Sequence, residues 1–221
     1  MKVYDLTGAI ESGMWGYGDP FPPVRIEPIA TIEKDGFSSH SFQMHSLAGT
    51  YVENGNHLLA GTESIDQVPV DRFIKTAWVA QLSEKEALEP VSAEELEAAV
   101  GDKIKPGDAL LVSTGWDKNW NKPGYVENNP FFLPEAMDWV VEKKISILGT
   151  DLTHIQDPRD DDGSLLRNLY MNDGLLIAPV VNLRKVDGIG PFTLVALPLL
   201  IPGVNSTPCR VVLMDSFNAN S

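Results

Sequence analysis

The chain is poor in cysteine and in basic residues, and it has no long apolar run. Its 221 residues include one cysteine, Cys209, which excludes an internal disulfide and a cysteine-rich zinc site. The 17 Lys and Arg residues face 31 Asp and Glu residues, a net charge of −14, whereas nucleic-acid binding needs clustered cations. No apolar run reaches the length of a membrane span, and no signal-type stretch opens the sequence. We therefore expect no nucleic-acid partner, no membrane association and a cytoplasmic location.

Several familiar catalytic and binding motifs are also missing. The glycines between positions 13 and 18 lack the lysine and the following helix of a phosphate-binding loop. No Gly-x-Ser-x-Gly sequence marks a serine nucleophile. Cys209 lies in an apolar, strand-like run, which favours a buried thiol over a catalytic one. The acidic run 157–163 lacks the twelfth-position carboxylate of an EF-hand, so we interpret it as a solvated loop that borders an active-site mouth.

What the sequence does contain is a regular set of apolar segments. Six of them predict strands, at 76–82, 109–114, 145–150, 175–181, 194–200 and 210–214. Most are continuous rather than alternating, which is typical of a sheet covered on both faces. Ser92 and Glu95 form a capping box that predicts a helix to about Val100. Pro134 begins a second helix, whose apolar stripe includes Trp139 as a core residue. Many strands and few helices indicate an α/β fold with a mixed sheet.

The organisation of the chain is simple. Residues 1–221 show no internal repeat and no long linker, and their length suits one domain. Residues 18–30 carry four prolines and predict an extended arm, because proline is excluded from helix interiors. This arm either packs on a partner subunit or forms a surface loop.

One segment carries a pattern that points to chemistry. Residues 46–57 read Ser-Leu-Ala-Gly-Thr-Tyr-Val-Glu-Asn-Gly-Asn-His. This segment resembles the signature His-x-Gly-Thr-His-x-Asp-x-Pro-x-His of the cyclase family, the metal-dependent hydrolases that include bacterial kynurenine formamidase and isatin hydrolase. Gly49, Thr50 and His57 fix the register. Fragments at 66–73, 110–116, 148–151, 181–183, 197–199 and 206–210 resemble the rest of the family pattern in the same order.

The resemblance implies a fold and an assembly. The cyclase family has a layered β/β/α sandwich with a mixed, barrel-like sheet and few helices. Its members usually assemble as dimers or tetramers, so the resemblance predicts a homodimer or homotetramer. The same resemblance implies a small-molecule substrate, because the family acts on small amides and cyclic compounds.

The family's metal-binding groups are mostly replaced in this chain. In the register above, the two early histidines of the family fall on Leu47 and Tyr51, and its aspartate falls on Glu53. Its later glutamate and histidine fall on Ala178 and about Leu166. In the family these groups hold zinc or manganese, which activates water and polarises a carbonyl. Only Glu53 keeps a ligating group, so we predict that the ordinary metal site is absent and that no cofactor is bound.

A relocated metal site is the alternative. His45 lies two residues before the first replaced histidine and on a strand would face the same side. His45, Glu53 and His57 would then hold zinc or manganese, together with Asp151 or His154.

The groups that remain form an acid–base set. His57 stands where the family has its catalytic histidine, so the resemblance implies a general base or proton shuttle. Glu53 would orient its imidazole or act as a partner acid or base, and Tyr51 would donate a hydrogen bond to a developing oxyanion. We interpret the set as metal-independent cyclisation, dehydration or hydrolysis of a small cyclic or carbonyl-bearing molecule. The alternatives are a metal-dependent amide or lactone hydrolase resembling the arylformamidases, and an inactive small-molecule-binding homologue.

Aromatic residues are predicted to line the substrate pocket. They fall in segments that are loop-like in the family that the chain resembles, and an aromatic lining suits a flat or apolar molecule. Core packing is the alternative, because aromatic rings bury well anywhere. The predicted substrate-binding residues are Trp15, Trp116, Trp120, Tyr125 and Phe131.

Overall fold

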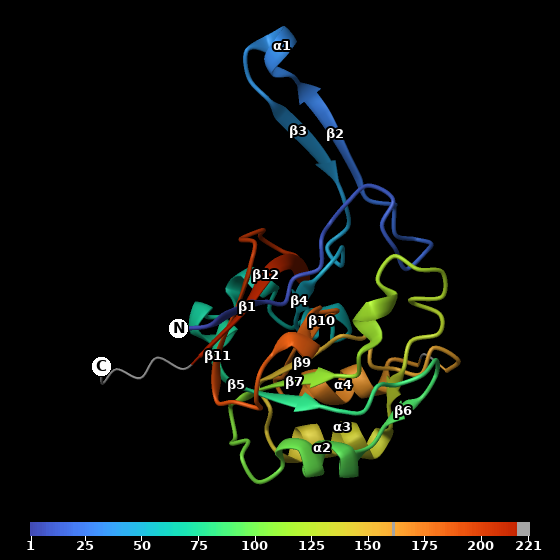
Figure 1. Cartoon of the computed structure of the whole chain (residues 1–221), viewed down its shortest axis with the longest axis vertical. Coiled ribbons are helices and arrows are strands. Elements are labelled where there is room, and N and C mark those ends of the chain that lie inside the picture. Colours follow the sequence, from blue (N-terminus) through green and yellow to red (C-terminus); the bar gives the residue numbers. More distant parts are fainter. Residues whose placement is uncertain (161, 216–221) are drawn as a thin grey trace.

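A barrel-like sheet forms the centre of the molecule (Figure 1). The computed structural model describes residues 1–160 and 162–215. Seven strands close into a ring, and β1 (Val3–Asp5) adds to it beside the last strand of the chain. The ring runs β12 (Ser206–Asp215), β11 (Phe192–Pro198), β5 (Ile74–Gln81), β7 (Ala109–Ser113), β9 (Ile147–Thr150), β10 (Leu175–Ala178) and β4 (Tyr51–Glu53).

Strand β12 closes the ring because it is long enough to pair with two strands of the ring. Its first residues, 206–208, pair with β4, and residues 209–215 pair with β11. The pairs β5–β7, β7–β9 and β9–β10 are parallel, and the remaining pairs are antiparallel. The mixed sheet that the strand pattern predicted is therefore confirmed, and so is the barrel-like form that the family resemblance implied.

Helices cover one face of this sheet, as Figure 1 shows for α2 (Ala93–Val100), α3 (Pro134–Glu142) and α4 (Ser164–Met171). The predicted capping box is present, because the Ser92 hydroxyl accepts from the Glu95 amide and the Glu95 carboxylate accepts from the Ser92 amide. Pro134 begins α3 as predicted, and Trp139 is buried. No helix in the described part of the chain is long and apolar enough to cross a membrane.

Two apolar cores explain the continuous apolar runs. Leu110 and Val112 face the helices, where they pack in one cluster with Met137. Leu111 and Ile147 belong to a second cluster, to which all seven strands of the ring contribute. A strand buried on both faces has no reason to alternate apolar with polar residues. Cys209 is a buried member of the second cluster, as the sequence predicted.

A long hairpin projects from the barrel (Figure 1). Its strands β2 (Arg25–Ala30) and β3 (Ser39–Gln43) pair with each other, and α1 (Ile32–Asp35) lies between them. The proline-rich segment 18–30 thus ends in a strand, and its packing on a partner subunit stays a prediction. A further small sheet joins β6 (Pro90–Val91) and β8 (Phe131–Phe132). Short 3-10 helices span Gly55–His57 (η1), Ile65–Gln67 (η2), Val70–Phe73 (η3), Trp116–Asn119 (η4) and Leu183–Lys185 (η5).

Candidate active site

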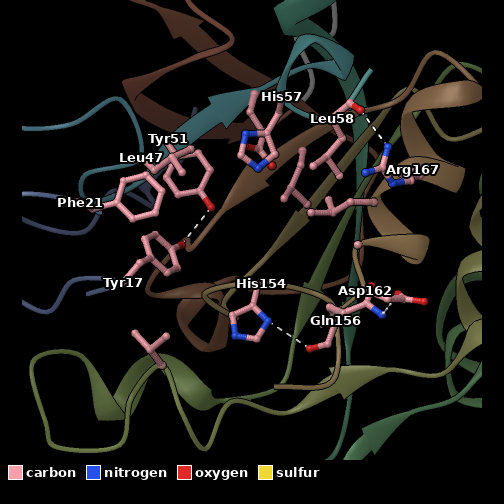
Figure 2. Close-up of a pocket in the computed structure, with 15 residues that line it drawn as sticks. Tyr17, Phe21, Leu47, Tyr51, His57, Leu58, His154, Gln156, Asp162 and Arg167 are labelled. Atoms are coloured by element: carbon pink, nitrogen blue, oxygen red, sulfur yellow. Dashed lines mark hydrogen bonds and ion pairs between the residues drawn. The ribbon is translucent and has the colours of Figure 1, made fainter. Parts of the chain in front are cut away.

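A pocket of about 460 Å³ opens between the N-terminal segment, β4 with the turn that follows it, the segment after β9, and α4 (Figure 2). It brings together Leu47, Tyr51, Glu53 and His57 of the signature segment with Leu166, the position aligned with the later histidine of the family. Ala178, aligned with the later glutamate, is not among the lining residues. The other described lining residues are Tyr17, Phe21, Leu58, Val126, His154, Gln156, Asp162, Gly163, Arg167 and Leu176. Asp161, in the predicted acidic loop, lies outside the described residues.

Glu53 is a buried carboxyl group with one satisfied oxygen. It ends β4 and is 1% exposed, between Leu176 of β10 and Ser206 of β12. The hydroxyl of Tyr170, from α4, donates a hydrogen bond to its Oε1. Its Oε2 has no hydrogen-bond partner among the described residues. Burial raises the pKa of Glu53 above its ordinary value, while His57 and the Tyr170 hydroxyl oppose this shift.

His57 stands beside this carboxyl group without bonding to it. It is the last residue of η1, which Asn54 caps by accepting from the Asn56 amide at 3.2 Å. Its Nδ1 lies 3.9 Å from Glu53 Oε2, which is too long for a hydrogen bond. The same Nδ1 lies 2.9 Å from the amide nitrogen Nδ2 of Asn205.

Tyr51 is paired with a second tyrosine. Figure 2 shows its hydroxyl directed at the hydroxyl of Tyr17, at 3.0 Å. Because Tyr17 donates its one proton to the Thr153 carbonyl at 2.7 Å, Tyr51 donates to Tyr17. Burial raises the pKa of both phenols, which keeps them neutral. The predicted donation from Tyr51 to an oxyanion therefore requires it to exchange this bond for one to substrate.

Comparison with known proteins identifies the family. The family model for Cyclase matches residues 4–157, more than half of the chain. The chain belongs to the cyclase family. Kynurenine formamidase of Salinibacter ruber (strain DSM 13855 / M31) is 25% identical over 177 residues, which are 80% of this chain and 79% of that protein.

Solved structures show the same fold. Isatin hydrolase A from Labrenzia aggregata, bound to benzyl benzoate, matches with a TM-score of 0.82 at 20% identity, over 97% of this chain and 93% of that one. Isatin hydrolase A from Ralstonia solanacearum matches with a TM-score of 0.83 at 17% identity, over 97% and 92% of the two chains. The relatives are hydrolases by name, and this cyclase-family chain has the same hydrolase-like architecture.

The cyclase family implies a metal, but the donors in this chain do not fit one. Among residues 1–160 and 162–215, no group of three or more His, Cys, Asp or Glu side chains is placed to hold a metal ion. His45 does not join Glu53 and His57; it lines a separate hollow of about 200 Å³, and its ring packs 5.0 Å from that of Phe21. Glu53 and His57 alone are too few donors for zinc or manganese.

The two other relocated ligands considered from sequence have different partners. Asp151 is fully buried, and its carboxylate accepts from the amides of Thr114 and Gly115 and from the Thr114 hydroxyl. Burial raises the pKa of Asp151 to about 6 against these bonds, and the carboxylate holds the turn after β7 together. His154 lines the pocket, and its Nδ1 donates to the Gln156 carbonyl at 3.1 Å, because a carbonyl can only accept.

The five predicted substrate-binding aromatic residues do not line the pocket. Trp15 packs edge-on against Trp120 and Tyr125, each at 5.3 Å, and against Tyr17 at 5.4 Å. The Trp116 indole donates to the Tyr125 carbonyl at 2.9 Å, and Phe131 is buried in β8. Trp116, Tyr125 and Phe131 are buried, and Trp15 and Trp120 are partly buried against the same apolar cluster, so these rings pack in and on the core and Trp15 supports Tyr17. The Phe and Tyr rings that line the pocket are those of Tyr17, Phe21 and Tyr51.

Proposed function

We propose that this chain is an enzyme that moves protons on a small carbonyl-bearing molecule, with His57 and Glu53 as its acid–base pair and without a metal ion. The observation that carries the proposal is the buried Oε2 of Glu53, which has no hydrogen-bond partner among the described residues and lies 3.9 Å from the His57 Nδ1 in one pocket. An unsatisfied carboxylate oxygen costs stability, and such groups concentrate at functional sites.

Desolvation suits Glu53 to proton transfer. A carboxyl group whose pKa is raised by burial is a stronger base when ionised, and a general base is most effective when its pKa approaches the working pH. The pair then serves proton removal beside a carbonyl, as cyclisation and dehydration require, or deprotonation of water in hydrolysis. The names of the hydrolase relatives make the formamide of kynurenine and isatin the first compounds to assay.

Replacement of the histidine tests the acid–base role. We expect His57→Ala to lower turnover by roughly 10²–10⁴-fold, the usual contribution of a positioned acid or base. His40→Ala is the matched control, because His40 is exposed on β3, away from the pocket lining. A loss of less than about threefold in His57→Ala contradicts the assigned role, because a positioned acid or base contributes far more. If the wild type binds both compounds without turning them over, and His57→Ala binds them with the same affinity, the inactive binding homologue is favoured.

Elemental analysis tests metal independence. We expect chain purified without chelators to hold zinc and manganese far below one ion per chain, and a chelator to leave turnover unchanged. Stoichiometric metal, lost together with activity on chelation, would instead support the metal-dependent hydrolase. His45→Ala then distinguishes the relocated site, because only that site requires His45.

A further inference from the structure

Asn205 is held rigidly beside the pocket, just before β12. Its backbone carbonyl accepts from the Asn54 amide at 3.1 Å, so it is tied to the turn that carries His57. The two preceding residues are also fixed, because the Val204 carbonyl accepts from the Ile65 amide at 2.8 Å and the Gly203 amide donates to Asp66 at 3.0 Å. The side chain of Asn205 therefore starts from a backbone with little freedom.

The contact of Asn205 with His57 determines where the ring proton lies. The Asn205 Nδ2 is 2.9 Å from His57 Nδ1, and an amide nitrogen can only donate. Nδ1 therefore accepts, and the single proton of the neutral imidazole is on Nε2. Glu53 Oε2 would favour the opposite tautomer, but at 3.9 Å it lies beyond hydrogen-bond distance of Nδ1.

We propose that Asn205 is a positioning residue that holds His57 in the Nε2-protonated tautomer. With Nδ1 occupied, His57 meets the substrate through Nε2, as a hydrogen-bond donor to the substrate carbonyl oxygen. Glu53 is then the group that takes the proton. This assignment rests on the proposed function: Glu53 is the proton acceptor of the pair, and His57 is its hydrogen-bond donor.

The proton balance follows directly. In proton removal beside the carbonyl, the proton passes to Glu53 Oε2, and the C–H electrons form a C=C bond while the C=O π pair moves to the oxygen. In hydrolysis, a proton of the attacking water passes to Glu53 Oε2, the water oxygen bonds to the carbonyl carbon, and the C=O π pair moves to the oxygen. The negative charge on that oxygen is stabilised by the Nε2–H of His57. A neutral imidazole that donates to a carbonyl oxygen, paired with a carboxylate base, is a known solution for this chemistry.

Nitrogen NMR of the full chain with ¹⁵N-labelled histidine tests the tautomer without any turnover. The chain has four histidines, and the signal lost in His57→Gln identifies the ring of His57. At a pH where the ring is neutral, we expect its Nδ1 to be unprotonated and its Nε2 to carry the proton. A protonated Nδ1 in the neutral wild-type ring would overturn the proposal, because the amide would then face the ring with its oxygen.

Variants of Asn205 separate a positioning role from a structural one. Asn205→Asp replaces the donor with an acceptor, so we expect the proton to move to Nδ1 and kcat to fall by about 10-fold or more, with little change in KM. Asn172→Asp is the control, because it adds the same charge at an exposed position after α4. An unchanged tautomer in folded Asn205→Asp contradicts the proposal. If the wild-type ring has the expected tautomer but His57→Ala is fully active, the proposed function is rejected while the positioning role of Asn205 stands.

Discussion

At the scale of single residues, Glu53 is the group whose protonation matters most for stability. Its carboxyl group is buried at the end of β4, and one oxygen has no partner among the described residues. The raised pKa means that the folded chain binds the Glu53 proton more tightly than the unfolded chain does. The stability that this group contributes is fully present below its unfolded pKa and is lost as pH rises through the folded value.

Glu53→Gln makes this dependence measurable. Glutamine keeps an acceptor for the Tyr170 hydroxyl but does not titrate, so the variant lacks the loss of stability at higher pH. We expect the Tm of the variant to gain on that of the wild type as pH rises from below the ordinary pKa of 4.5 toward neutrality. Glu127→Gln, at an exposed position, is the control. A Tm difference that stays constant with pH would contradict burial as the cause of the shift.

At the scale of elements, α4 is tied to the sheet through its last turn. Tyr170 reaches from this helix to the carboxyl group of Glu53, and both side chains are buried. Leu165 and Leu169 of the same helix pack in the cluster that lies under the helices. The helix therefore positions the Glu53 carboxyl group as well as covering the sheet.

Tyr170→Phe measures how much the hydrogen bond between Tyr170 and Glu53 stabilises the fold. The variant leaves Glu53 without a hydrogen bond from the described residues, so we expect unfolding free energy to fall by about 1–3 kcal/mol at neutral pH. Tyr125→Phe is the matched control, because the buried Tyr125 hydroxyl has no hydrogen-bond partner among residues 1–160 and 162–215. Equal losses in thermal or chemical unfolding of the two variants would show that the Tyr170 bond contributes nothing.

The sequence predicted the elements that have strong local signals. The buried runs of β7 and β9 and the capping box of α2 fall where expected. Helix α4 was missed because it begins after Gly163, in a left-handed conformation, with no capping side chain on that glycine. The strand at 175–181 ends early, at Ala178, because Pro179 has no amide to continue the ladder.

The candidate site was only partly predictable, because only some of its residues lie in one local sequence motif. Tyr51, Glu53 and His57 lie within seven residues of one another, so one motif revealed all three. Tyr170 and Asn205 reach them from α4 and from the start of β12, and no local pattern marks either residue. Tertiary contacts alone make them part of the site.

At the scale of the whole molecule, closure of the barrel creates the site. Strand β4 is three residues long and pairs with β10 on one side and β12 on the other. This double pairing places Asn205 beside the turn that carries His57, although 148 positions separate them in sequence. A site built this way depends on the complete sheet, so the proposed acid–base pair is a property of the closed fold rather than of its motif.

The projecting hairpin is the feature that a single chain leaves unexplained. An isolated two-stranded hairpin is marginally stable in water, yet β2 and β3 extend away from the barrel (Figure 1). Its large apolar side chains are mostly in solvent, with Ile29, Phe37 and Phe42 exposed by 67%, 59% and 67%. Burying such a surface on a second copy would stabilise both hairpins, which is the physical basis for expecting a homodimer or homotetramer.

Phe42→Lys tests the hairpin as the contact between copies. We expect light scattering to give an oligomer for the wild type and a smaller particle for the variant, because a lysine on an exposed strand disfavours both apolar burial and edge pairing. Met171→Lys is the control, because Met171 is 74% exposed but lies on α4, outside the hairpin. A monomeric wild type would contradict the hairpin as a contact between copies. An oligomer that survives in Phe42→Lys and dissociates in Met171→Lys would contradict it as well. Loss of the oligomer in Phe42→Lys alone would show that exposed apolar residues on the hairpin serve assembly.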